Sequence, residues 1–156
     1  SDTANDIIKF VVIERHRASG RMGKGFVRGF GLKSGAFAST VAHDSHNLGI
    51  LGTNDADMLI AAQRATELGG GLVVVRDGVV LAELALPVAG LVSDLPLEQV
   101  TEHVHELLTA ARQCGCVLED PFATMSFLPL VPIPELRLTD MGLVDAVKFE
   151  LAELFV

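Results

Sequence analysis

The sequence has no tryptophan and no tyrosine, and eight phenylalanines are its only aromatic residues. It therefore lacks the amphipathic rings that commonly anchor protein interfaces and stack on nucleic-acid bases. Basic residues are also few, because 12 Lys and Arg stand against 20 Asp and Glu, which gives a net charge of -8. Nucleic-acid binding draws most of its affinity from Lys and Arg contacts with phosphates, so we expect no nucleic-acid partner.

Long apolar runs are missing as well. Charges, glycine or proline interrupt every run before about 18 residues, so we expect no membrane-spanning segment. The N-terminus has no signal-peptide pattern, which makes a cytoplasmic location the default expectation. The two cysteines, Cys114 and Cys116, are separated by one residue, where a disulfide would be strained, and no second pair completes a zinc site. We interpret them as free thiols.

What remains is an ordinary globular composition. The 156 residues are 49% hydrophobic and 21% charged, which suits one domain that buries roughly 70% of the surface of its unfolded chain. The first residue is Ser1 rather than Met, which suggests a processed or excised piece.

Local patterns predict an α+β fold. β-branched and aromatic residues, or alternating ones, predict strands at 7–13, 25–32 and 36–42, and Asp77-Gly78 between two β-branched runs predicts a hairpin of 72–75 with 79–84. Helical spacing predicts one helix from an N-cap at 53–55 to Gly69 and a second from Asp94-Leu95-Pro96 to near Gly115. We therefore expect a single domain of mostly antiparallel sheet with two main helices.

The last third of the chain gives weaker signals. Asp120-Pro121 and the prolines at 129, 132 and 134 predict extended or irregular structure, because proline cannot donate a backbone hydrogen bond. The tail from 143 to 156 is too ambiguous to assign.

Two short strings resemble known binding motifs, but the secondary structure predicted around them does not fit those motifs. Gly23-Lys24-Gly25 with Gly29 has one residue too many for the dinucleotide fingerprint and leads into a predicted strand rather than a helix. His103-Val104-His105 has the spacing of a metal-binding pair, but that spacing shares a face only on a strand. On the predicted helix the two rings point roughly 200° apart, so a solvated helix face is the better interpretation.

The densest group of polar side chains is His43-Asp44-Ser45-His46-Asn47, which directly follows a predicted strand. Both imidazoles and the carboxylate can ligate a metal, and all five side chains can form hydrogen bonds. On a continuing strand the two histidines would face opposite sides, whereas a tight turn would bring them together. The chemistry alone leaves open whether this is a functional site or only a polar turn that satisfies backbone groups.

A second charged cluster, Glu14-Arg15-His16-Arg17, follows the first predicted strand. A solvated turn is the simpler interpretation of this cluster.

Long strings of the sequence resemble the C-terminal domain of the adenine deaminase family. They are "VVIERHRASGRMGKGFVRGFGLKSGAFASTVAHDSHN", "GTNDADM", "GGGLVVV", "LPVAGLVSD" and "LEDPFATMSFL". The resemblance implies a parent amidohydrolase that converts adenine and water into hypoxanthine and ammonia at a dinuclear manganese or iron centre in an upstream (β/α)₈ barrel. Since a barrel needs roughly 250 residues, we expect residues 1–156 to be an accessory domain without it, inactive in isolation.

The resemblance also suggests roles for the polar clusters. We expect His43, Asp44 and His46 to assist catalysis, Ser45, Asn47, Glu14 and His16 to contact substrate, and His43 with His46 to help bind an additional metal ion. The expected partners are the catalytic barrel on the same or a separate chain, adenine, and a second copy in a homodimer. Two alternatives stay open: a structural and oligomerisation module, or a free-standing purine- or metal-binding domain.

Overall fold

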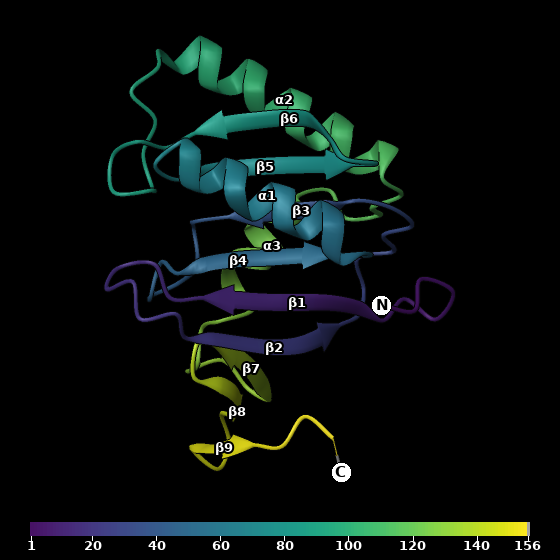
Figure 1. Ribbon diagram of the computed structural model, residues 1–156, viewed down its shortest axis with the longest axis vertical. Coiled ribbons are helices and arrows are strands. Elements are labelled where there is room, and N and C mark those ends of the chain that lie inside the picture. The colour runs from purple at the N-terminus through teal and green to yellow at the C-terminus, as the bar shows by residue number, and fades with distance from the viewer. Residues whose placement is uncertain (156) are drawn as a thin grey trace.

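A computed structural model describes residues 1–155 and places six strands in one fully antiparallel sheet. They are β1 (Ile8–Ile13), β2 (Met22–Val27), β3 (Ala36–Ser39), β4 (Leu48–Gly52), β5 (Gly71–Arg76) and β6 (Val79–Ala85). The strand order is β2-β1-β4-β3-β5-β6 (Figure 1). A smaller antiparallel sheet contains β7 (Leu136–Thr139), β8 (Gly142–Asp145) and β9 (Glu150–Ala152). The predicted α+β class with antiparallel sheets is confirmed.

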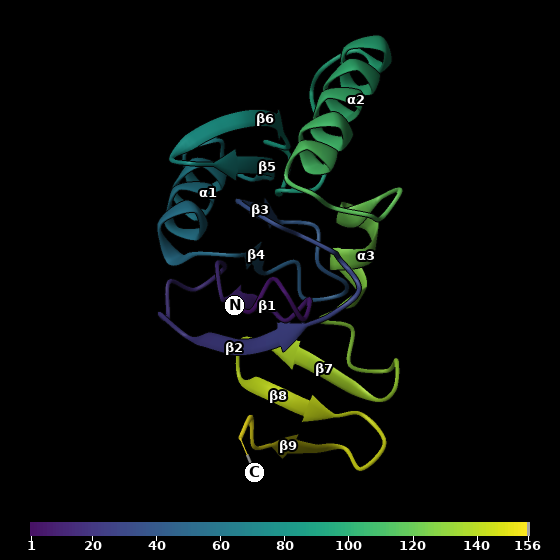
Figure 2. The ribbon, with the colours of Figure 1, turned by 90° about the vertical axis from the view of Figure 1, so that its right-hand side faces the viewer.

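Helices cover both faces of the main sheet (Figure 2). Helix α1 (Asp55–Glu67) lies on one face, α2 (Leu97–Gln113) and α3 (Pro121–Phe127) lie on the other, and β7 and β8 pack against β2. The alternation along β1 explains this arrangement, because Phe10 and Val12 enter the core beneath α2 and α3 while Val11 enters the core beneath α1. Within residues 1–155, no helix is long and apolar enough to cross a membrane.

Helix α1 begins where its capping signal predicts. The Asn54 side chain accepts a hydrogen bond from Asp57 N at 2.8 Å. The Asp57 carboxylate in turn accepts from the backbone N–H groups of Asp77 and Gly78 at the hairpin turn, at 3.2 and 2.8 Å. Burial opposes ionisation of Asp57, but these bonds and one from Asn54 lower its pKa overall. The hairpin and the two main helices are thus confirmed, and Asp57 fastens the hairpin turn to α1.

Three expectations about elements were wrong. The strand predicted at 36–42 is β3 at Ala36–Ser39, so three residues separate it from the polar cluster at His43. The predicted strand at 25–32 is β2 at Met22–Val27, because Gly29 and Gly31 take positive φ angles of 98° and 68° and end the extended segment. Irregular structure was expected after Asp120, but α3 begins there, with Asp120 accepting from Ala123 N at 2.9 Å and Pro121 in the first turn. Proline in that position starts a helix rather than breaking one.

Candidate functional site

The candidate site lies at the end of the main sheet where strands β1 and β6 end and strand β4 begins. Ile13, the last residue of β1, is paired with Leu48, the first residue of β4. The segment that follows β1 and the polar loop that precedes β4 therefore emerge side by side. The segment after β6 begins at the same end of the sheet (Figure 1), so three stretches of chain meet there.

The polar loop His43–Asn47 turns tightly. Residues 43–45 form a turn, and His46 N donates to Ala42 O at 2.5 Å. His46 has a positive φ of 50°, which reverses the chain before β4. The rings of His43 and His46 lie edge to face with centroids 6.0 Å apart, and the His43 ring also lies 5.0 Å from that of Phe127. The turn thus brings the two histidines together, which is the arrangement that a functional site at this loop requires.

The five side chains of this loop are exposed to different degrees. Asp44 and Ser45 are exposed, His43 and His46 are half-buried, and Asn47 is buried at 4% exposure. His46 Nδ1 and Asn47 Oδ1 are buried without a hydrogen-bond partner within residues 1–155. Because an unsatisfied buried polar atom is costly, a loop that keeps two of them is a candidate for contact with a ligand or another protein segment.

Asn47 is held by a residue from the small sheet. Its Nδ2 donates to Asp140 Oδ1 at 3.1 Å, and Asp140 Oδ2 accepts from Arg21 Nε at 2.9 Å. Asp140 lies in the turn between β7 and β8, a region without a sequence assignment. Neither Asp140 nor Arg21 was predicted, and only the tertiary structure brings them to the loop.

Arg15 ties two loops together. Its Nε donates to His46 O at 2.5 Å and its Nη2 to Ala89 O at 2.7 Å, while burial lowers its pKa. A Cβ atom at Gly90 would lie 2.4 Å from Arg15 Nη2, so the glycine makes room for the guanidinium. Arg15 stands in the charged cluster at the end of the first predicted strand, and that position is the signal from which its role could have been found.

The two other predicted residues of that cluster behave differently. Glu14 is buried, and its carboxylate accepts from Ser19 Oγ at 2.7 Å, from Ser19 N, and from the backbone N–H groups of Arg17 and His16. These bonds, with Ser19 first, lower the pKa of Glu14 to about 2. Glu14 is therefore ionised at neutral pH and organises its own loop.

His16 reaches the polar loop directly. Its Nε2 lies 2.8 Å from Ser45 O, and since a carbonyl can only accept, the geometry assigns the proton to Nε2. The cluster at 14–17 is thus more than a solvated turn, because Arg15 and His16 both hold the backbone of the His43–Asn47 loop.

A cavity of about 410 Å³ lies beside the exposed side of the loop. Asp44, Ser45, Thr139 and Asp140 are its polar lining residues. Its remaining lining is mostly apolar and comes from 129–132 and from the small sheet, including Met141, Val144 and Leu151. The loop therefore faces a hollow with a mostly apolar lining, to which both the loop and the turn after β7 add polar side chains.

The donors of the loop do not by themselves form a metal site. Within residues 1–155 there is no group of three or more His, Cys, Asp or Glu side chains placed to hold one ion. His43 and His46 could supply two nitrogen ligands at most, so an ion held there would need further ligands from outside these residues.

The motifs set aside in the sequence have structural roles or none. His103 and His105 lie on helix α2, as expected. Cys114 and Cys116 are free and buried, and burial raises the pKa of Cys114 to about 11, which keeps it a thiol. A Cβ atom at Gly23 would lie 1.8 Å from Thr139 O, so this glycine allows β7 to approach β2 rather than a phosphate to bind.

The chain is similar along its length to known proteins of one family. The family described as "Adenine deaminase C-terminal domain" matches residues 1–150. Proteins named adenine deaminase are similar throughout: one from Clostridium botulinum (strain Loch Maree / Type A3) is 54% identical over 99% of this chain, one from Methylobacterium nodulans 55% over 96%, and one from Brucella abortus 54% over 96%. In each case the chain spans 26% of the relative's length. The chain therefore belongs to the family of adenine deaminase C-terminal domains.

Proposed function

We propose that this chain is the accessory domain of an adenine-hydrolysing enzyme and that its His43–Asn47 loop completes the active site formed by the rest of that enzyme. Hydrolytic deamination needs an activated water, proton transfer to the ring and to the leaving ammonia, and exclusion of bulk solvent. A domain that covers the mouth of a catalytic barrel would supply the exclusion of water and part of the proton transfer.

The observation that carries this proposal is the way the loop is held. Arg15 and His16 bond its backbone, and Asp140 bonds Asn47, so two segments far apart in the sequence fix a loop of only five residues. Asp44 and Ser45 are exposed; the Asp44 side chain forms no hydrogen bond within residues 1–155, and Ser45 Oγ accepts only from Asn47 N, at 3.4 Å. Catalysis and binding require groups positioned in advance by a rigid support, and this loop has that property.

Each predicted residue then has a distinct proposed role. Asp44 is the group best placed to contact a bound purine or to transfer a proton, because it is exposed at the cavity. Ser45 would contact the substrate beside it, while His43 and His46 would act as auxiliary acid–base groups. Asn47 and Glu14 would support the loop from within rather than touch the substrate, since both side chains are buried.

The metal that the family resemblance implies, manganese or iron, belongs in this proposal to the catalytic barrel. Its chemistry there would be the activation of the attacking water. The donors described above do not complete a coordination sphere, so His43 and His46 would at most share an ion with ligands of the barrel. No step proposed for this chain depends on that ion.

The test is a pair of substitutions in a full-length adenine deaminase that carries this domain. Asp44→Asn changes an exposed side chain that forms no hydrogen bond or ion pair within residues 1–155, and we expect it to lower kcat/KM for adenine at least about ten-fold without changing the melting temperature. His46→Ala should also lower kcat/KM. His103→Ala on the far helix α2 is the matched control and should have no effect. Unchanged kcat/KM and metal content in both loop variants would refute the proposal.

A second candidate function is favoured by the small sheet. Several apolar side chains of β8, β9 and their connections are at least 60% exposed, namely Met141, Val147, Phe149 and Leu151. Such a patch is typical of an interaction surface. If the domain is mainly an oligomerisation module, the isolated chain will sediment as a dimer without metal or purine, and the loop variants will leave catalysis unchanged.

A further inference from the structure

The main sheet has a half-open face next to helix α1. This helix packs on β3 to β6, and no helix lies over β1 and β2 on this face of the sheet (Figure 1). A cavity of about 490 Å³ lies there, on the face of the sheet opposite α2 and α3. It is separate from the His43–Asn47 loop, which contributes no residue to it.

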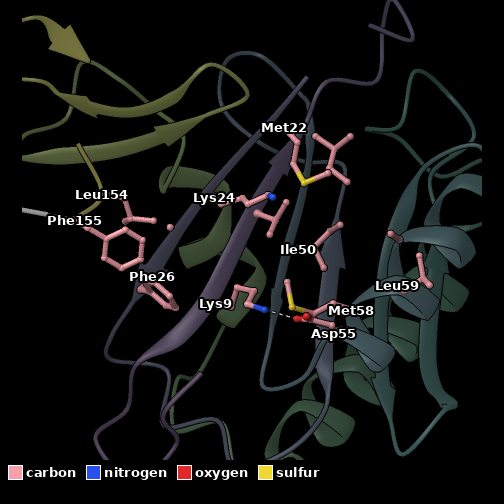
Figure 3. Close-up of a pocket in the computed structure, with 14 residues that line it drawn as sticks. Lys9, Met22, Lys24, Phe26, Ile50, Asp55, Met58, Leu59, Leu154 and Phe155 are labelled. Atoms are coloured by element: carbon pink, nitrogen blue, oxygen red, sulfur yellow. Dashed lines mark hydrogen bonds and ion pairs between the residues drawn. The ribbon is translucent and has the colours of Figure 1, made fainter. Parts of the chain in front are cut away.

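The register of the strands determines which side chains form the floor. Val11 stands between Lys24 of β2 and Ile50 of β4, and Ile13 stands between Met22 and Leu48. Met58, Leu59 and Ala62 of α1 form one wall, and Leu154 and Phe155 line the opposite side, near Phe26 (Figure 3). The interior is therefore mostly apolar and has a wall on two sides.

Three charged groups lie at the rim, and they carry a net positive charge. Lys9 donates to the Asp55 carboxylate, which neutralises both (Figure 3). Lys24 forms no ion pair within residues 1–155, and its side chain extends over the pocket toward Ile50 (Figure 3). An unpaired ammonium at the mouth of an apolar cavity is notable in a chain whose net charge is -8.

We propose that this pocket binds a small amphipathic monoanion, whose apolar body fills the cavity over Val11 and Ile50 and whose carboxylate or similar head pairs with Lys24. The volume falls within the range of small-molecule sites, roughly 300–1,000 Å³. The pairing of one cation with an otherwise apolar lining matches a ligand with one charged end and no other polar group. A neutral ligand of the same shape would leave Lys24 unpaired. A cationic ligand would be repelled by the Lys24 ammonium.

The experiment uses the 156-residue chain and decanoate as the probe, with decan-1-ol and decyltrimethylammonium as ligands of similar shape and different charge. Binding is measured by calorimetry, and the site is located from the NMR shifts of the methyl groups of Val11, Ile50 and Met58. We expect decanoate to bind most tightly and to shift these methyl signals.

Three variants locate the interaction. Lys24→Met keeps an apolar stem and removes the charge, so it should weaken decanoate binding about ten-fold while leaving decan-1-ol within two-fold. Ala62→Phe fills the cavity and should weaken both ligands. Lys148→Met removes an exposed lysine of the small sheet and is the matched control, with no expected effect.

The result that overturns the proposal is equally specific. Equal binding of the anion and the cation, or decanoate binding unaffected by both Lys24→Met and Ala62→Phe, would show that the pocket does not recognise this ligand class. Absence of decanoate binding together with dimerisation that Ala62→Phe abolishes would assign the face to a second copy of the chain instead. Melting temperatures of all variants identify any that fail to fold, and Lys24→Met, an exposed strand position, should retain the fold.

Discussion

Single side chains fix the loops at the candidate site. Arg15 spans from His46 O to Ala89 O, and Glu14 accepts four hydrogen bonds from its own loop. Neither side chain is free for chemistry, and each positions backbone that carries exposed groups. This division of roles explains why charged residues at the end of β1 are needed for the shape of the site even where they do not touch a substrate.

Glu14 gives a prediction about pH. The folded pKa is about 2 against an ordinary value of 4.5, so the carboxylate stabilises the folded chain fully above pH 4.5. This contribution is lost as the pH falls through the folded pKa. Replacing Glu14 with Gln leaves one acceptor oxygen where there were two. We expect Glu14→Gln to lower the melting temperature at pH 7, and the gap from the parent chain to shrink between pH 4.5 and 2.

The measurement is thermal unfolding by circular dichroism across that pH range. Glu102→Gln, at an exposed position on α2, is the control and should leave the melting temperature unchanged. A Glu14→Gln deficit that stays constant from pH 7 to pH 2 would show that the carboxylate does not act through its ionised form.

Strand β2 joins the main sheet to the small one. Its inward residues are Gly23 and Gly25, and the backbone of β7 lies against Gly23 so closely that a Cβ atom there would be 1.8 Å from Thr139 O. At Gly25 a Cβ atom would only reach the side chain of Leu138, at 3.4 Å. Two glycines of the same strand thus make different demands on their neighbours.

We therefore expect Gly23→Ala to destabilise the chain by about 1–3 kcal/mol, because β7 must move away from β2. The displaced turn would also carry Asp140 away from Asn47 and loosen the candidate site. Gly25→Ala is the matched control and should cost much less. Chemical denaturation gives both values, and equal effects of the two substitutions would contradict the close approach of β7.

The chain as a whole corresponds to one part of longer relatives. It spans 26% of the length of its relatives, and its site loop faces a hollow lined by the exposed small sheet. Its polar loop is held in place, but the described residues contain no group of three or more His, Cys, Asp or Glu side chains that could hold a metal ion. An active site shared with a barrel would explain this combination.

The corresponding prediction concerns the isolated chain. We expect the pure 156-residue protein to form no detectable hypoxanthine from adenine, with or without manganese, when products are separated by liquid chromatography. A full-length family member assayed in parallel is the positive control. Turnover by the isolated chain, abolished by His46→Ala, would instead establish a complete active site within it.

Local sequence determined much of this protein. Asp77-Gly78 fixes the hairpin, Asn54 starts α1, the stripe of apolar residues fixes α2, and the polar string at His43 marks the candidate site, since turns, caps and periodicity act over a few neighbouring residues. Only the tertiary structure decided which distant groups support that site. Asn47 meets Asp140 across 93 positions, and Arg21 meets it across 119. These contacts form because β7 packs on β2. Patterns in neighbouring residues do not indicate which distant surfaces pack together.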